Sequence, residues 1–141
     1  MTTPNERRIR AGYDLFLAAN HAVDSDWTPD APVAALMADD IQWFDDENQV
    51  GGAPETALIN KDLVLGRLRQ LRREMPCCQI LSCFEDETQK VVHTVDHALK
   101  LDDSSFGRTR PHLCASSFQF DETGKVKTVR YCSRELPLNS P

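Results

Sequence analysis

The stretch from Val91 to Leu101, VVHTVDHALKL, constrains the fold more than any other part of the sequence. Apolar residues recur at alternate positions, which predicts a β-strand with one buried face, because successive side chains of a strand point to opposite sides. The more apolar of the two parities also carries His93 and His97. Imidazole titrates near neutral pH and can exchange a proton there. We therefore expect this parity to line either the hydrophobic core or the wall of a reaction chamber.

Length and charge limit the class of protein. At 141 residues the chain is expected to form a single domain, 1–141, with a flexible tail at 136–141. The net charge of −6 argues against a nucleic-acid partner, because phosphate binding needs a basic face. The sequence has no run of about 18 apolar residues, so we expect no membrane partner. Without an apolar segment of the signal-peptide type near the N-terminus, a cytoplasmic location is expected.

The cysteine pattern predicts reduced thiols and no metal site. The sequence has five cysteines, an odd number, and no secretion signal accompanies them. Zinc would require a C-x-x-C pair or an equivalent His/Cys spacing, which the sequence lacks. It also has no Gly-rich phosphate loop and no nucleophile elbow. We therefore expect chemistry that uses neither a metal nor a cofactor.

The order of periodic segments predicts an α+β fold. Helical spacing indicates helices over 5–22, 33–38 and 60–75, with Asn60 as the cap of the third helix and Gly66 as a point of close packing. Val126 and Val129 differ in parity within one strand, which implies a β-bulge. Strand patterns cover 41–45, 56–59, 77–84, 89–101, 110–120 and 125–135. Helices gathered on one side of a curved antiparallel sheet would give this architecture.

Three local segments carry a family resemblance. They are 38–45 (ADDIQWFD), the helix that follows the loop at Gly51 and Gly52, and 118–126 (FQFDETGKV). The chain resembles the NTF2-like superfamily over about residues 6–135, in particular its SnoaL-like and scytalone-dehydratase-like branches. The resemblance implies a cone in which a curved antiparallel sheet wraps around a long helix, with further helices at the N-terminus. It also implies a homodimer and a cavity for a hydrophobic small-molecule substrate.

The resemblance to scytalone dehydratase also implies particular site residues. That protein has two histidines on adjacent strands and an aspartate just after its first helix. The matching positions here are His97, His112 and Asp24, which we expect to be catalytic. Trp43 stands where that pattern has a tyrosine, so one hydroxyl of the pattern is missing.

Strand parity adds further candidates. Asp45 shares a parity with Trp43 and could orient an imidazole, or it could belong to a solvated acidic loop with the acidic residues that follow it. We expect substrate contacts from residues on inward parities and on the stripe of the first helix: His93, Trp43, Tyr131, Phe118, Arg110 and Tyr13.

The leading hypothesis is a cofactor-independent isomerase, cyclase or dehydratase. It would apply His/Asp general acid–base chemistry to a hydrophobic polycyclic intermediate of polyketide or terpenoid biosynthesis. Two alternatives remain open at this point. One is a non-catalytic domain for ligand binding or dimerisation. The other is an epoxide hydrolase, for which Asp96, Arg110 and Arg130 could form an Asp–Arg set only if the strand faces are the reverse of those expected.

Overall fold

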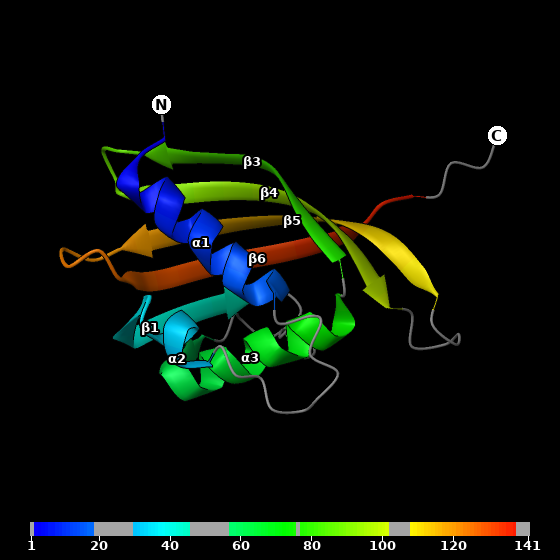
Figure 1. Cartoon of the computed structure of the whole chain (residues 1–141), viewed down its shortest axis with the longest axis horizontal. Helices are drawn as coiled ribbons and strands as arrows, with labels where there is room; N and C mark the ends of the chain where they lie inside the picture. The colour runs from blue at the N-terminus through cyan, green and yellow to red at the C-terminus, as the bar shows by residue number, and fades with distance from the viewer. Residues whose placement is uncertain (1, 19–29, 46–56, 76, 102–107, 138–141) are drawn as a thin grey trace.

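Three helices and six strands make up the described part of the chain (Figure 1). A computed structural model describes residues 2–18, 30–45, 57–75, 77–101 and 108–137. Asp24 and most of the expected C-terminal tail lie outside these residues. The elements in chain order are α1 (Pro4–Ala18), α2 (Asp30–Ala34), β1 (Met37–Asp45), β2 (Leu58–Ile59), α3 (Lys61–Glu74), β3 (Cys77–Asp86), β4 (Val91–Leu101), β5 (Thr109–Phe120) and β6 (Val126–Glu135). Within the described ranges, no helix is long and apolar enough to cross a membrane.

The strands form a single mixed sheet in the order β2-β1-β6-β5-β4-β3. Strands β3 to β6 are an antiparallel meander, as predicted. The expectation of a wholly antiparallel sheet is wrong, because β1 runs parallel to β6, with Trp43 opposite Val129. The chain leaves β1 through β2 and α3 before it builds the meander, so the last strand returns beside β1 in the same direction. The sheet bends over the helices, and this α+β arrangement confirms the predicted fold class (Figure 1).

Helix α3 begins and ends where the sequence predicts. The side chain of Asn60 accepts a hydrogen bond from the backbone N–H of Leu63 at 3.0 Å, which satisfies one of the free donors of the first turn. The apolar stripe packs inward, with Val64 and Leu71 almost fully buried. The expected close packing at Gly66 is wrong, because a Cβ built there meets no atom within 4 Å. Gly66 lies on the exposed side of the helix.

Helix α1 is fixed at its N-terminal end to the last residues of β3. Thr3 and Glu6 form a capping box, in which each side chain accepts a hydrogen bond from the other residue's backbone N–H at 3.1 Å. Glu6 also accepts a hydrogen bond from the backbone N–H of Glu85 at 3.0 Å. The Asn5 side chain donates to the Glu85 carboxylate at 2.8 Å. These contacts hold the helix across the concave face of the sheet.

The buried face of β4 is the opposite of the one predicted. Val92, Thr94, Asp96 and Ala98 are buried and face the helices, whereas the parity of His93 is only half-buried. The prediction chose the more apolar parity, but that parity lies on the outer face of the sheet. The inner parity is less apolar because two of its members are polar and, as shown below, one of them lines a cavity.

The faces of β5 and β6 agree with the predicted parities. Cys114, Ser116 and Phe120 point inward from β5. On β6 both Val126 and Val129 are buried, and the register between β5 and β6 shifts beside them, which confirms the predicted irregularity.

Candidate active site

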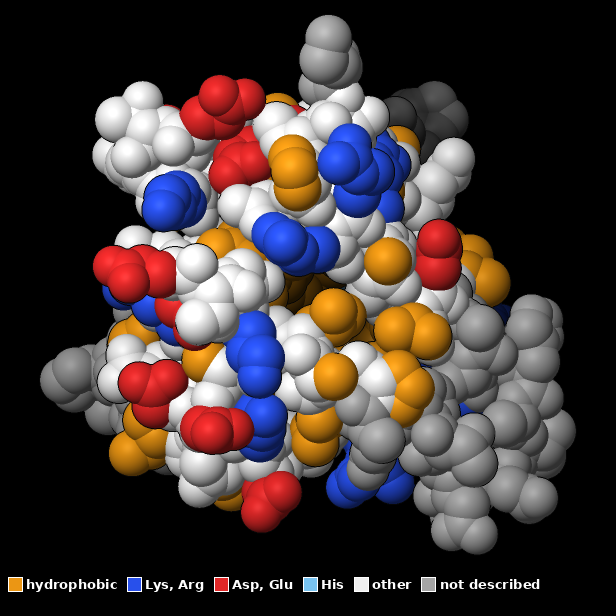
Figure 2. All heavy atoms as spheres, turned by 60° about the vertical axis from the view of Figure 1, so that its left-hand side comes forward, with side chains coloured by type: hydrophobic (Ala, Val, Ile, Leu, Met, Phe, Trp, Pro, Cys, Tyr) orange, Lys and Arg blue, Asp and Glu red, His pale blue; other side chains and the backbone are white. Residues whose placement is uncertain are grey.

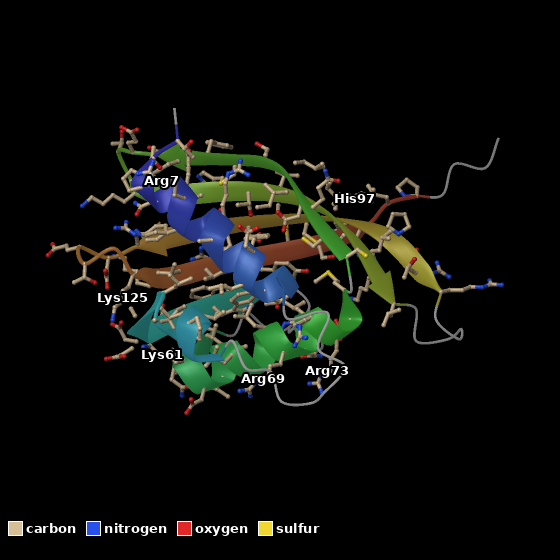
Figure 3. The ribbon with its side chains drawn as sticks, in the orientation of Figure 1. Arg7, Lys61, Arg69, Arg73, His97 and Lys125 are labelled. Carbon is tan, nitrogen blue, oxygen red and sulfur yellow. The ribbon has the colours of Figure 1, made fainter. Side chains whose placement is uncertain are left out.

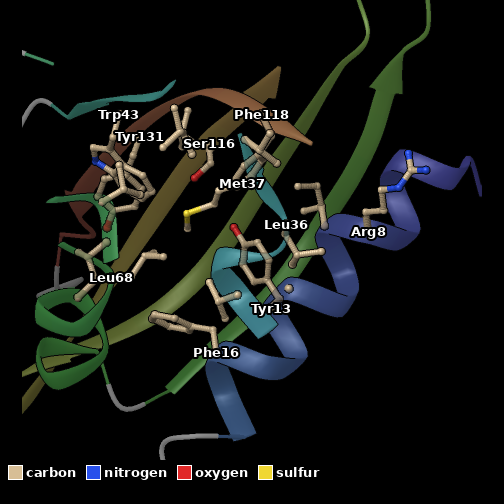
Figure 4. A pocket seen from close by; sticks show the side chains of 18 of the residues that line it. Arg8, Tyr13, Phe16, Leu36, Met37, Trp43, Leu68, Ser116, Phe118 and Tyr131 are labelled. Carbon is tan, nitrogen blue, oxygen red and sulfur yellow. The ribbon is translucent and has the colours of Figure 1, made fainter. Parts of the chain in front are cut away.

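A cavity of about 140 Å³ lies between the concave face of the sheet and the three helices (Figure 4). Its walls are mainly apolar and aromatic side chains, among them Phe16, Trp43, Val64, Leu68, Leu71 and Phe118. Figure 2 shows a hollow on one face of the molecule, with apolar side chains at its bottom and Lys and Arg side chains beside it. Such a surface favours an apolar ligand, and any polar group in the wall is a candidate for orienting it.

The strongest such candidate is the carboxyl group of Asp96, at the middle of β4. Asp96 lines the cavity and is 4% exposed. Its Oδ2 atom accepts a hydrogen bond from the Tyr13 hydroxyl at 2.8 Å and lies 3.6 Å from the Cys78 thiol. Its Oδ1 atom has no hydrogen-bond partner among the described residues. A buried acceptor without a donor is costly, so this atom is suited to meet a group of a bound ligand.

Burial sets the protonation behaviour of this group. Removal from water raises the pKa of Asp96 to about 6, although the hydrogen bonds from Tyr13 and Cys78 act in the opposite direction. Burial, together with the neighbouring charge of Asp96, raises the pKa of Tyr13 well above its ordinary value. The pKa of the Cys78 thiol is also raised, chiefly by burial. Tyr13 and Cys78 thus remain neutral donors, while Asp96 changes its charge close to neutral pH.

Hydroxyl and thiol groups complete the polar part of the wall. The Tyr13 hydroxyl lies 3.1 Å from Thr94 Oγ1, and Ser116 faces Thr94 across the β4–β5 pair. Tyr131, from β6, has sulfur atoms near its hydroxyl: Cys114 Sγ at 3.6 Å and Met75 Sδ at 3.9 Å. Within the described ranges, no group of three His, Cys, Asp or Glu side chains is arranged to hold a metal ion. The arrangement can transfer a proton through Asp96 and can bind an oxygen atom through neutral donors.

Solved structures with the same architecture identify the fold. A protein of unknown function from Burkholderia pseudomallei, described as NTF2-like, superposes with a TM-score of 0.66 at 15% identity, over 92% of this chain and 90% of that one. The chain has the NTF2-like fold. A proposed isomerase from Bacillus subtilis matches with a TM-score of 0.66 at 9% identity, over 94% of this chain and 90% of that one. A proposed SnoaL-like polyketide cyclase from Jannaschia sp. CCS1 matches with a TM-score of 0.65 at 13% identity, again over 94% and 90%.

The likeness is confined to the NTF2-like architecture. No protein-family model matches the sequence, and no curated protein matches it significantly. At these identities the solved structures say which fold the chain has, so any catalytic role must be argued from its own side chains.

Two predicted histidines lie outside the cavity of the NTF2-like cone. His93 and His97 project from the outer face of β4, and Figure 3 marks the position of His97. The His93 ring packs on Phe84 with the ring centroids 5.2 Å apart, and its Nδ1 atom lies 2.9 Å from Ser117 Oγ. The expectation that these imidazoles line the cavity is wrong, because the strand presents its other parity to the helices.

The third predicted histidine faces inward but lies away from the cavity lining. His112 has the inward parity of β5, as expected, and its Nδ1 atom lies 3.0 Å from Ser133 Oγ. Arg110, two residues earlier, is exposed and forms an ion pair with Glu135 at 2.8 Å. Neither residue is part of the cavity wall. Arg130 lies over the Phe44 ring at 4.3 Å and also lies outside the lining, so the Asp–Arg set of an epoxide hydrolase is not assembled around Asp96.

Asp45 supports the cavity wall rather than an imidazole. It is fully buried, and its Oδ2 atom accepts hydrogen bonds from Arg67 Nε at 2.6 Å and from Trp43 Nε1 at 3.0 Å. The alternative of a solvated acidic loop is therefore wrong for this residue. The Trp43 ring packs against Tyr131 at 5.8 Å, so the buried ion pair fixes the aromatic end of the cavity. Of the expected substrate contacts, Trp43, Tyr131, Phe118 and Tyr13 do line the cavity.

Proposed function

We propose that the protein is a cofactor-independent isomerase or lyase, of the cyclase or dehydratase type, in which Asp96 is the general acid–base. The observation that carries the proposal is the buried Asp96 Oδ1 atom, which lacks a hydrogen-bond partner in the described structure and belongs to a mainly apolar cavity. The similarity to a proposed isomerase and a proposed polyketide cyclase supports this reaction class and a role in natural-product biosynthesis. Asp96 replaces His97 as the proposed base, because it supplies the carboxyl group among the described lining residues and changes its charge near neutral pH.

The proposed reaction is a proton transfer at a carbon next to a carbonyl group. The Asp96 carboxylate takes the proton, and the electron pair of the broken C–H bond moves into the carbonyl system to form an enolate. The protonated carboxyl then returns the proton to another carbon, which gives isomerisation, or to a leaving oxygen, which gives dehydration. A pKa of about 6 suits both directions, because the group can gain and lose a proton near neutral pH.

Tyr13 has a positioning role in this scheme. Its hydroxyl donates to Asp96 Oδ2 and leaves Oδ1 for the substrate. Since burial keeps the phenol neutral, it stabilises the charged carboxylate without competing for the proton. A positioned acid or base of this kind typically contributes about 10²- to 10⁴-fold to the rate.

Hydrogen–deuterium exchange at ketone α-carbons tests the proposal. Acetophenone, cyclohexanone and 3-cyclohexen-1-one are incubated with protein in D₂O at neutral pH, and loss of the α-proton signal is followed by NMR. We expect wild-type protein to accelerate exchange of at least one ketone over buffer, and Asp96→Asn to lose at least about 100-fold of that acceleration. His97→Gln is the control and should keep it. Exchange at the buffer rate with wild type, or equal rates in wild type and Asp96→Asn, would disprove the assignment.

The outer face of the sheet supports a second proposal, a homodimer. Phe84 is 53% exposed and Leu113 is 38% exposed, and both lie beside the apolar outer parity of β4. Apolar side chains gathered on an uncovered sheet face favour association with another surface. We propose that a second copy of the chain covers this face, whether or not the cavity is catalytic.

A further inference from the structure

The capacity of the cavity and the charge at its end restrict the ligand more closely. We propose that the ligand is a carboxylic acid with about one ring, bound with its apolar body in the cavity and its carboxylate on Arg8. The inference rests on the proposed function for the role of Asp96, but ligand binding can be measured without turnover.

The volume limits the body of the ligand to about one ring. The cavity measures about 140 Å³ within the described walls. An apolar cavity of about 150 Å³ holds one benzene molecule, whereas pockets for larger ligands measure roughly 300–1,000 Å³. Val64 and Ile41 in the wall are fully buried, so enlarging the cavity would require the packed core to move. A polycyclic substrate, expected from the sequence, exceeds this space.

Arg8 brings a positive charge to one end of the cavity. Figure 4 shows Arg8 at one end and Trp43 and Tyr131 at the other. The guanidinium lies against Gly124, where an added Cβ would be 3.0 Å from Cζ and 3.1 Å from each terminal nitrogen. One terminal nitrogen donates to the neutral side chain of Asn5. In the described part of the chain, no carboxylate is paired with this guanidinium, so its N–H groups can donate to the carboxylate of a ligand.

The two charges of the cavity wall fix the orientation of such a ligand. Among the described lining residues, Arg8 and Asp96 are the charged ones. A ligand carboxylate placed beside Asp96 would meet a like charge, whereas at Arg8 it meets an opposite one. Arg8 and Tyr13 are five residues apart on α1, or about 7.5 Å along the helix axis, and both line the cavity. One substituted ring spans roughly this length, so a carbonyl on its far side would reach the Tyr13–Asp96 pair.

Three probes and two arginine variants test the proposal by binding. The probes are 4-acetylbenzoate, acetophenone without the carboxylate, and 6-acetyl-2-naphthoate with a second ring, each titrated by ligand-detected NMR at low salt. We expect 4-acetylbenzoate to bind about three- to tenfold more tightly than acetophenone, because a partly exposed ion pair is worth a modest factor. Arg8→Gln should remove this advantage. We expect the naphthoate to bind at least tenfold more weakly than 4-acetylbenzoate.

Arg7→Gln is the matched control for the charge. Arg7 is the neighbouring exposed arginine of α1, it bonds to the backbone oxygen of Thr2, and it lies outside the cavity lining (Figure 3). The Arg7→Gln variant should still bind 4-acetylbenzoate more tightly than acetophenone. Added salt should weaken this preference in wild type. Equal binding of 4-acetylbenzoate and acetophenone, or equal losses in both arginine variants, would overturn the role of Arg8. Tight binding of the naphthoate would overturn the size limit, and no binding of any probe at millimolar concentration would overturn the whole inference.

Asp96→Asn separates this inference from the proposed function. The variant should lose ketone exchange but keep the Arg8-dependent preference for 4-acetylbenzoate. A wild-type protein that accelerates ketone exchange but shows no preference for 4-acetylbenzoate would instead disprove the ligand assignment and leave the catalytic one standing.

Discussion

The two faces of β4 differ in a way that sequence pattern does not show. The outer face has the more apolar parity and carries His93 and His97, whereas the inner face carries Thr94 and Asp96. The inner face is nevertheless the one covered by helices, and its acid is held by a tyrosine from α1. The difference teaches that the face of a strand that lines a cavity can be more polar than the outer face of the same sheet. The helix-covered side and the outer side should therefore respond very differently to substitution.

The largest difference is expected between two ion pairs. On the helix-covered side, Arg67 of α3 pairs with Asp45 of β1, and their side chains are 4% and 0% exposed. In the other pair, the side chains of Arg110 and Glu135 are 49% and 43% exposed. Arg67→Ala removes the cation of a buried ion pair and should lower the free energy of unfolding by about 3–5 kcal/mol. Arg110→Ala should lower it by about 1 kcal/mol or less. Urea denaturation at pH 7 measures both, and equal losses would contradict the comparison.

Asp96→Asn is expected to stabilise the protein in a pH-dependent way. Because the folded-state pKa of about 6 exceeds the unfolded value of about 3.9, the folded state disfavours the carboxylate. The contribution of protonated Asp96 to the stability of the folded state is complete below about pH 4 and is lost as the pH rises through 6. At pH 8 the wild type should therefore be less stable than Asp96→Asn by up to about 3 kcal/mol.

The pH series supplies the control for this prediction. Unfolding free energies of wild type and Asp96→Asn are compared at pH 4, 6 and 8, and their difference should shrink toward zero at pH 4. The same carboxylate should raise the rate of ketone exchange as the pH rises through about 6, so activity and stability should change in opposite directions. A difference that stays constant with pH would rule out a raised pKa at this site.

A charge on the outer face should weaken self-association. Phe84→Glu places a carboxylate on the uncovered side of β3, next to the His93 ring. We expect the dimer dissociation constant to rise at least about tenfold, because a charge at the centre of an apolar contact must be desolvated. Sedimentation velocity measures the effect, with Gln70→Glu at an exposed position of α3 as a control. A wild-type chain that sediments as a monomer would refute the proposed dimer.

The smallest effect is expected at the outer histidine. His97→Ala should change the free energy of unfolding by about 0.5 kcal/mol or less, as is usual for surface positions without a special role. It should also leave ketone exchange within about twofold of wild type. A tenfold loss of exchange, with stability unchanged, would restore the histidine as a catalytic candidate.

Much of the fold could be predicted because local rules are strong in this chain. Asn60 supplies a cap, Gly124 supplies a positive φ of 84° in the β5–β6 turn, and the meander strands alternate clearly. The partner of β1 could not be predicted, because pairing with β6 depends on the path of the whole chain rather than on either strand's composition.

The site was harder to predict than the fold. Parity correctly placed Trp43, Phe118 and Tyr131 in the wall, because on each of these strands the large aromatic residues mark the buried face. It failed on β4, where both faces contain apolar residues. One signal for Asp96 was present in the sequence. It is an acid in the middle of a strand, on the same face as Val92 and Ala98, and a buried acid needs hydrogen-bond partners or a neutral form. Its donor, Tyr13, comes from the other end of the chain, and only the folded structure brings the two together.

The parallel pairing of β1 with β6 has a consequence for how the molecule forms. Strand β1 cannot pair with β6 until the last strand has been synthesised, so this contact has one of the greatest sequence separations in the fold. Such distant pairing slows folding, because the intervening chain must be ordered before the contact is made. Trp43 and Tyr131 meet across this pairing, so the aromatic end of the cavity cannot form in a nascent chain that still lacks β6.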